Sequence, residues 1–141
     1  MSGHEDVLHS EELLRGAMRA ASIGMCLVAP DGSFLEVNPA LCELLGPEEP
    51  VLLTTTWQEL THPDDLQTDI ALAQAVLDGE RDSYRLSKRY LRPDGEVVWG
   101  DLAVSCVRDA DGAVMNFVSQ INDATRRVKA EQKVARAEQQ F

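Results

Sequence analysis

This sequence has few aromatic residues, few cysteines and no long apolar run, and acidic residues outnumber basic ones almost two to one. It contains 13 Lys or Arg and 24 Asp or Glu among 141 residues, a formal net charge of −11. Such a negative field repels phosphates, which argues against a nucleic-acid or anionic-membrane partner. No apolar run approaches the roughly 20 residues of a membrane-spanning helix, and no secretory signal is recognisable. We therefore expect a cytoplasmic domain with no membrane segment.

The three cysteines, Cys26, Cys42 and Cys106, stand in apolar patterns without paired spacing. Disulfide frameworks and metal sites need closer or paired spacing, so we interpret these residues as reduced core cysteines. The sequence also lacks a Gly-rich phosphate loop, a nucleophile elbow and a His-x-x-x-His motif. The acidic pair Asp64-Asp65 is better explained by a helix start. We expect no metal site, no catalytic residue and no enzymatic activity in this chain.

The clearest structural signal is a run of three antiparallel strands over residues 83–91, 97–107 and 113–121. Asp94-Gly95 and Asp111-Gly112 mark the two turns, because Gly tolerates positive φ and Asp bonds its own backbone. In the middle strand Gly100, Leu102, Val104 and Cys106 alternate with Trp99, Asp101, Ala103 and Ser105. Both faces are partly apolar, so other parts of the structure must cover each of them.

The preceding residues predict a hairpin and a series of helices. Strands over residues 23–29 and 33–37 flank a Pro-Asp-Gly turn. Asn38 caps a helix that stops at Gly46. Two short helical turns follow in residues 48–61, with Val51, Leu52, Trp57 and Leu60 facing inward. A longer helix covers residues 65–78.

A helix lies at each end of this order. We expect residues 1–9 to be loose and Ser10 to cap a helix reaching Ala21, with an apolar stripe of Leu14, Ala17, Met18 and Ala21. The stripe either packs on the domain's own sheet or also contacts a second subunit, and the sequence leaves both open. The helix over residues 124–140 buries little alone, so it needs a partner. Together the two helices predict a parallel homodimer with the amino-terminal stripe at its interface.

The element order and several motifs resemble a PAS domain of the bacterial sensory type, with its carboxy-terminal PAC extension. The motifs are Ile23-Gly24-Met25, Asp31-Gly32, Asn38-Pro39-Ala40, His62-Pro63-Asp64-Asp65, Lys88-Arg89-Tyr90, Asp94-Gly95, Trp99, Asp111-Gly112 and Asp123-Ala124-Thr125. The resemblance implies an α+β fold, with a five-stranded antiparallel sheet, helices on one face, an amino-terminal cap helix and a carboxy-terminal linker helix. It divides the chain into a tail and cap helix (1–21), a sensor domain (22–123) and a linker helix (124–141).

The usual task of this family is sensing and signal relay. The resemblance implies that the linker helix leads to an output domain outside this chain, such as a diguanylate cyclase, a phosphodiesterase or a histidine kinase. The module either binds a small molecule or senses through rearrangement of a dimer. The alternative is a ligand-free dimerisation and structural relay module.

The cofactors of the family can be compared with this sequence motif by motif. The flavin photoreceptors of the family carry a reactive Cys in a Gly-x-Asn-Cys-Arg-Phe-Leu-Gln run, and residues 48–60 have no Cys. The helix over residues 65–78 has no His to bind haem. We therefore predict no bound cofactor and a colourless domain, with haem disfavoured. A non-covalent flavin or another small organic ligand stays open, because its contacts lack a short motif.

The resemblance also places residues around an interior cavity. The candidate lining residues are Cys26, Val28, Leu41, Leu44, Leu45, Ile70, Ala73, Leu77, Arg89, Leu102, Val104, Phe117, Ser119 and Ile121. If Arg89 faces the cavity it cannot be buried unpaired, so it either pairs with an internal acid, which we favour, or holds an anionic ligand. Trp99, on the opposite face, lies under the amino-terminal helix or at a dimer contact.

The same resemblance assigns signal relay to Asp123 and Thr125. In the family this Asp-x-Thr motif ties the sheet to the output helix. Asp123 can accept backbone N–H groups at the helix start and is able to pair with Arg126 or Arg127.

Overall fold

The computed structural model describes the backbone of residues 2–139 and the side chains of residues 10–139. The chain forms six helices and five strands within these residues. In order they are α1 (Ser2–Ala20), β1 (Gly24–Val28), β2 (Phe34–Val37), α2 (Pro39–Leu45), α3 (Glu49–Leu52), α4 (Trp57–Leu60), α5 (Pro63–Leu77), β3 (Ser83–Leu91), β4 (Val97–Arg108), β5 (Val114–Asp123) and α6 (Thr125–Gln139).

The five strands form one antiparallel sheet in the order β2-β1-β5-β4-β3. The three strands predicted over residues 83–121 are three of its five strands, and β4 pairs along its length with both neighbours. The amino-terminal hairpin completes the sheet by pairing β1 with β5, so that Cys26 lies opposite Ser119. The predicted α+β fold and strand count are therefore confirmed.

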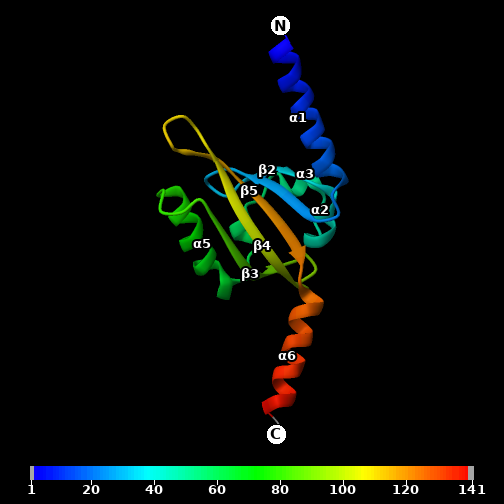
Figure 1. Ribbon diagram of the computed structural model, residues 1–141. Helices are drawn as coiled ribbons and strands as arrows, with labels where there is room; N and C mark the ends of the chain where they lie inside the picture. Colours follow the sequence, from blue (N-terminus) through cyan, green and yellow to red (C-terminus); the bar gives the residue numbers. More distant parts are fainter. Residues whose placement is uncertain (1, 140–141) are drawn as a thin grey trace.

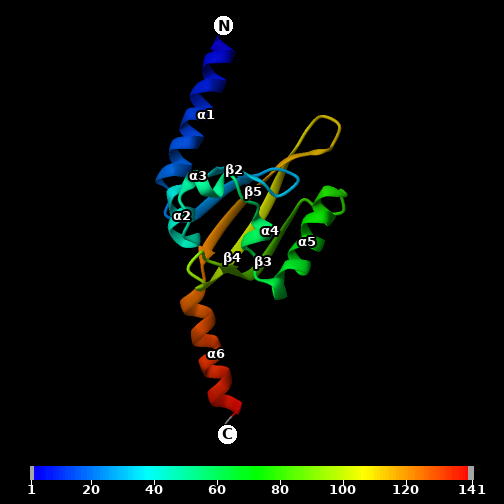
Figure 2. The same cartoon turned by 180° about the vertical axis from the view of Figure 1, so that it is seen from behind.

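The two faces of the sheet differ. Figure 1 looks at the sheet with β4 and β5 in front, and Figure 2, seen from behind, has α4 and α5 in front of it. The side covered by α2 to α5 holds the buried core, including Leu41, Leu52, Tyr90 and Phe117. The other side carries polar and small residues such as Ser87, Asp101 and Ala103 beside some apolar ones, and no helix of the described residues covers it in Figure 1. The expectation that both faces would be covered is therefore wrong for this face.

Asn38 joins three elements at the top of the core. Its side-chain oxygen accepts hydrogen bonds from the backbone N–H groups of Leu41 (3.0 Å) and Met25 (2.9 Å). Its side-chain nitrogen donates to the carbonyls of Met18 (2.8 Å) and Ile23 (2.9 Å). Because the residue is fully buried, these four bonds satisfy its polar groups while capping α2 and fixing the end of α1.

The first helix differs from the prediction at its start. α1 begins at Ser2, whereas we expected residues 1–9 to be loose and Ser10 to cap the helix. The residues before Ser10 include good helix formers and no proline, so Ser10 continues the helix. Similarly, α5 begins at Pro63 rather than Asp65, because the His62 ring nitrogen Nδ1 accepts from the Asp64 N–H (3.1 Å) and caps it.

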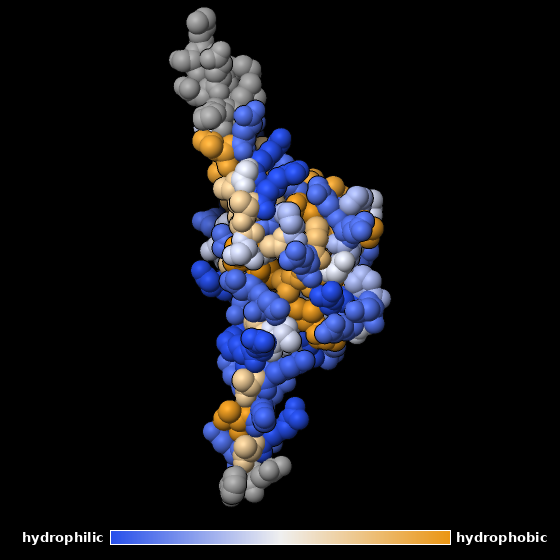
Figure 3. Space-filling model, turned by 90° about the vertical axis from the view of Figure 1, so that its right-hand side faces the viewer, coloured by the Kyte–Doolittle hydropathy of each residue, from blue (hydrophilic) through white to orange (hydrophobic). Residues whose placement is uncertain are grey.

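The two terminal helices extend away from the domain in opposite directions (Figure 1). The last turns of α1 meet β2, where Arg15 pairs with Glu36 (3.6 Å), but Leu14 and Ala17 of the apolar stripe are exposed. The stripe as a whole therefore does not pack on the sheet, and its contact with a second subunit stays a prediction. Leu13 and Leu14 are 61% and 72% exposed, and Figure 3 shows apolar atoms on the described part of this helix. Within the described residues, no helix is both long and apolar enough to cross a membrane.

Candidate functional site

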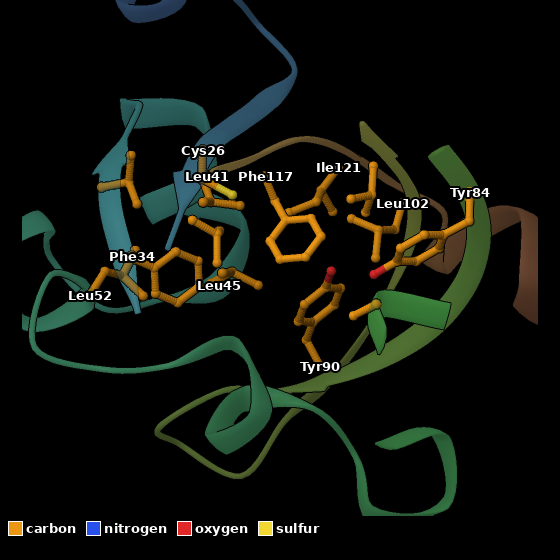
Figure 4. Close-up of a cluster of buried hydrophobic side chains, with 14 of the residues drawn as sticks. Cys26, Phe34, Leu41, Leu45, Leu52, Tyr84, Tyr90, Leu102, Phe117 and Ile121 are labelled. Carbon is orange, nitrogen blue, oxygen red and sulfur yellow. The ribbon is translucent and has the colours of Figure 1, made fainter. Parts of the chain in front are cut away.

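A small cavity lies between the inner face of the sheet and helices α2, α4 and α5. Its volume is about 30 Å³, enough for a molecule of the size of water. Figure 4 shows the surrounding cluster, with the hydroxyls of Tyr84 and Tyr90 pointing toward its middle. The lining residues are Cys26, Val28, Phe34, Leu45, Trp57, Asp69, Ala73, Tyr84, Lys88, Tyr90, Leu102, Val104, Phe117, Ser119 and Ile121. A larger ligand would have to displace some of these side chains.

A buried ion pair forms the polar part of this lining. Lys88 on β3 and Asp69 on α5 are each 1% exposed, and the Lys88 Nζ lies 2.5 Å from an Asp69 carboxylate oxygen. The Tyr84 hydroxyl donates to the other oxygen of Asp69 (2.7 Å), and Lys88 also donates to the Thr61 hydroxyl (2.9 Å). An isolated charge at this depth would be very costly, so these partners hold both charges in the core.

Aromatic rings complete the surroundings of Lys88. Its Nζ lies 4.8 Å from the centroid of the Trp57 ring and 4.6 Å from that of Tyr90, distances typical of cation–π contacts. Burial lowers the pKa of Lys88, and the negative charge of Asp69 opposes that fall. Burial together with Asp69 raises the pKa of Tyr84, so this hydroxyl keeps its proton and donates a hydrogen bond to Asp69.

Most of the predicted lining residues meet at this cavity. Nine of them line it: Cys26, Val28, Leu45, Ala73, Leu102, Val104, Phe117, Ser119 and Ile121. Burial raises the pKa of the Cys26 thiol to about 12, which keeps it neutral. Leu41 is buried elsewhere in the core, and Leu44 and Leu77 are half-buried against its edge. That these residues bind a ligand stays a prediction.

Ile70 is 37% exposed and does not reach the cavity. The predicted inward stripe of α5 had the wrong rotation about the helix axis. The buried residues of this helix are Asp69, Ala73 and Val76, at the spacing i, i+4 and i+7. Choosing Ile70 in place of Asp69 turns the stripe by one residue, or about 100°.

Arg89 does not line the cavity either, because it alternates with the β3 residues that do, which are Tyr84, Lys88 and Tyr90. Its predicted pairing with an acid is present at the edge of the sheet. The guanidinium donates to both carboxylate oxygens of Asp65 (3.0 and 2.9 Å), and these bonds, with the backbone N–H and the charge of Arg89, hold the pKa of Asp65 below its usual range. The ring of Trp99 lies under the same guanidinium, 5.2 Å from its central carbon.

The predicted relay residues lie where β5 ends and α6 begins. Asp123 accepts from the backbone N–H of Thr125 (2.9 Å), as expected. The Thr125 hydroxyl accepts from the backbone N–H of Trp99 on β4 (3.0 Å), and the Trp99 carbonyl accepts from the N–H of Ala124 (2.8 Å). Trp99 therefore lies at the base of α6, and the prediction that places it under α1 is wrong.

A second contact fastens the same helix to β4. Arg127 on α6 pairs with Asp101 (2.7 Å) rather than with Asp123. Asp101 also accepts from the hydroxyl of Ser87 on β3 (2.6 Å), so this link spans three elements. The first turn of α6 is thereby held to the outer side of β4.

The remaining candidates are simpler to place. In the predicted dimer stripe, Leu14 and Ala17 on α1 are exposed, whereas Met18 on α1 and Ala21 just after it are half-buried, so the exposed half of the stripe is available for a partner. Cys42 and Cys106 are half-buried, and all three cysteines are free. Among the described residues, no cluster of three His, Cys, Asp or Glu side chains is arranged to hold a metal.

Comparison with known proteins agrees with this architecture. A family profile described as PAS fold matches residues 34–121. The chain is 40% identical over 126 residues to the probable diguanylate cyclase DgcE of Escherichia coli (strain K12), covering 89% of this chain and 11% of that protein. The chain thus spans about a ninth of the length of this relative.

Two solved structures resemble the fold closely. An RNA-binding light-oxygen-voltage receptor matches with a TM-score of 0.78 and 26% identity, over 92% of this chain and 37% of that one. A sensory box histidine kinase/response regulator from Burkholderia thailandensis E264 matches with a TM-score of 0.72 and 23% identity, over 90% of this chain and 95% of that one. The second likeness bears on the fold alone.

Proposed function

This chain belongs to the PAS fold family, and from that premise we propose that it is a sensory module that passes a change at its interior cavity to an output domain through α6. The observation that carries this proposal is the double role of β4. Leu102 and Val104 point from this strand into the cavity. Trp99 and Asp101 of the same strand hold the first turn of α6. A displacement of β4 at the cavity would therefore also displace the start of α6.

We propose a diguanylate cyclase as the output domain. The relative from Escherichia coli supports this choice, since its similarity covers nearly all of the present chain at 40% identity. The chain itself corresponds to a small part of that protein, so catalysis would belong to a separate domain. In this arrangement α6 is the connection whose position or pairing controls the cyclase.

The input has two candidate forms. One is a small molecule that enters the cavity and reorganises the polar group around Lys88. The other is a ligand-free rearrangement of a dimer, which is favoured by the small cavity volume of about 30 Å³ and by the exposed Leu13 and Leu14 of α1. Native and denaturing mass spectra of the purified chain, with an absorption scan, separate them. A retained small molecule supports the first form, and a dimer without any bound species supports the second.

Asp123→Ala in the longer protein that carries the output domain tests the relay. The side chain of Asp123 is exposed and caps α6, so its loss should cost about 0.5–2 kcal/mol locally and leave the domain folded. We expect cyclic-di-GMP formation to lose its regulation. Asp94→Ala is a matched control, since Asp94 accepts from the N–H two residues later (2.8 Å) in a turn between β3 and β4. Normal regulation in Asp123→Ala, or equal loss in both variants, would contradict the proposal.

A further inference from the structure

Two carboxylates of α5 form ion pairs with two successive residues of β3. Asp65 and Asp69 are four residues apart, so they lie on nearly the same face of the helix. Asp69 binds Lys88 inside the cavity, and Asp65 binds Arg89 at the edge of the sheet. Successive residues of a strand point to opposite faces. The helix is thus fixed to β3 from the core side and from the outer side together.

The Asp65 contact is more extensive than a surface ion pair. One carboxylate oxygen accepts from the backbone N–H of Arg89 (2.7 Å) and from its Nε (3.0 Å), and the other accepts from a terminal guanidinium nitrogen (2.9 Å). The Arg89 carbonyl accepts in turn from the N–H of His62 (3.0 Å). A two-pronged contact of this kind fixes the plane of the guanidinium as well as its position.

That guanidinium plane lies over Trp99, the residue directly opposite Arg89 on β4. The backbone of Trp99 makes two hydrogen bonds with the start of α6, one to Thr125 and one from Ala124. A continuous series of contacts therefore runs from the cavity through Asp69, the first turns of α5, Asp65, Arg89 and Trp99 to α6.

We propose that Arg89 is a positioning residue that transmits the state of the buried Lys88–Asp69 pair to α6 through the Trp99 ring. This proposal rests on the proposed function and gives it a second route beside β4 itself. When the buried pair is disturbed, α5 moves as a rigid rod, and Asp65 moves with it. Because Arg89 holds Asp65 at three points, its guanidinium follows and changes its contact with Trp99.

The two tryptophans report separately on the two ends of this series. Trp57 lies beside Lys88 at the cavity, and Trp99 lies beside Arg89 at the base of α6. Fluorine NMR of the chain labelled with fluorotryptophan therefore gives one resonance for each end. Trp57→Phe and Trp99→Phe assign the two resonances.

Tyr84→Phe is the perturbation at the cavity end. It removes the hydroxyl that donates to Asp69 and changes little else, so the domain should stay folded. We expect Tyr84→Phe to shift the Trp57 resonance and also the Trp99 resonance, although Tyr84 and Trp99 are five positions apart along the paired strands β3 and β4.

The same perturbation is then made in an Arg89→Gln background. Here we expect the Trp57 response to persist and the Trp99 response to fall at least severalfold. Arg85→Gln is the matched control, because Arg85 is an exposed arginine on the same face of β3 and should leave both responses intact. A Trp99 response of unchanged size in the Arg89→Gln background, or no Trp99 response with Arg89 present, overturns the proposal.

Output activity of the longer protein separates this proposal from the proposed function. If Tyr84→Phe changes cyclic-di-GMP formation equally with and without Arg89→Gln, the domain passes the signal to the output domain without Arg89. The inference about Arg89 is then wrong. If the Trp99 response depends on Arg89 while no variant changes cyclic-di-GMP formation, the coupling stands and the proposed function fails. If both depend on Arg89, both are supported.

Discussion

Removing the lysine of the buried ion pair should destabilise this domain severely. Lys88→Met keeps an unbranched side chain of similar length but leaves the Asp69 carboxylate with the Tyr84 hydroxyl as its one remaining side-chain hydrogen-bond donor given by the structure. Breaking one side of a buried pair typically costs about 3–5 kcal/mol, because an uncompensated charge stays in the core. The free energy of unfolding of a native protein is about 5–15 kcal/mol, so Lys88→Met would remove a large part of the stability.

The triple variant Lys88→Met/Asp69→Leu/Tyr84→Phe tests the cause of that loss. It removes both charges and the hydroxyl that donates to Asp69, so no buried charge is left without its partner. The buried Thr61 hydroxyl loses its hydrogen bond from Lys88 but still donates to the Trp57 carbonyl (2.8 Å). Replacing a buried pair by apolar residues is often neutral or stabilising. We therefore expect the triple variant to be more stable than Lys88→Met by at least about 2 kcal/mol, less any cost of repacking.

Urea unfolding followed by far-UV circular dichroism measures these differences, with tryptophan fluorescence as a second probe, to which Trp57 beside Lys88 and Trp99 both contribute. An osmolyte such as trimethylamine N-oxide keeps Lys88→Met folded if it is marginal in buffer. The reasoning is refuted if Lys88→Met loses less than about 1 kcal/mol, because that would mean Asp69 finds water or another cation in place of Lys88. It is also refuted if the triple variant is no more stable than the single one.

Three further predictions follow from the exposed helix, the buried thiol and the edge ion pair. Leu14→Asp should fold normally, since Leu14 is 72% exposed. In sedimentation at micromolar concentration, we expect the wild type to be a dimer and this variant a monomer. A wild-type monomer would contradict the dimer proposal. Iodoacetamide should modify Cys106 well before Cys26, because a thiol pKa raised from 9.0 to about 12 lowers the thiolate fraction about a thousandfold; equal rates in the folded protein would contradict this burial. Arg89 depresses the Asp65 pKa below 3.8, so this ion pair stabilises the fold above that pH, and the stabilisation is lost as the pH falls through the depressed value. Asp65→Asn should therefore lose less stability than the wild type during an acid titration. An unchanged profile would count against a stabilising Asp65–Arg89 pair.

The sequence predicted the sheet and most of the helices because their signals are local. Asp-Gly turns, strand alternation and the Asn38-Pro39 helix start each depend on a few neighbouring residues. The Asp123–Thr125 hydrogen bond was predictable for the same reason. The start of α1 was not, because Ser10 can cap a helix or continue one, and the choice depends on residues further upstream.

The site was harder to predict because each of its two central residues, Asp69 and Lys88, is buried only in the presence of the other. Asp69 and Lys88 are charged, so a search for inward-facing apolar positions passes over both and selects the wrong rotation of α5 and the wrong face of β3. Each is tolerated inside the core only because the other is present. A pair of this kind, 19 residues apart along the chain, has no local signal. Arg89 was singled out for the right reason, its need for an acid, but that acid lies at the sheet edge.

The central claim is that the state of the cavity reaches the output domain through the start of α6. Ala73→Val adds two methyl groups to a buried side chain that lines the cavity, and cyclic-di-GMP formation by the longer protein is measured with this change, with Asp123→Ala and with both together. We predict that Ala73→Val alters activity on its own and has a much smaller effect once Asp123→Ala has removed the cap at the start of α6. If Ala73→Val changes activity by the same factor in both backgrounds, the signal does not pass through this junction and the account is wrong.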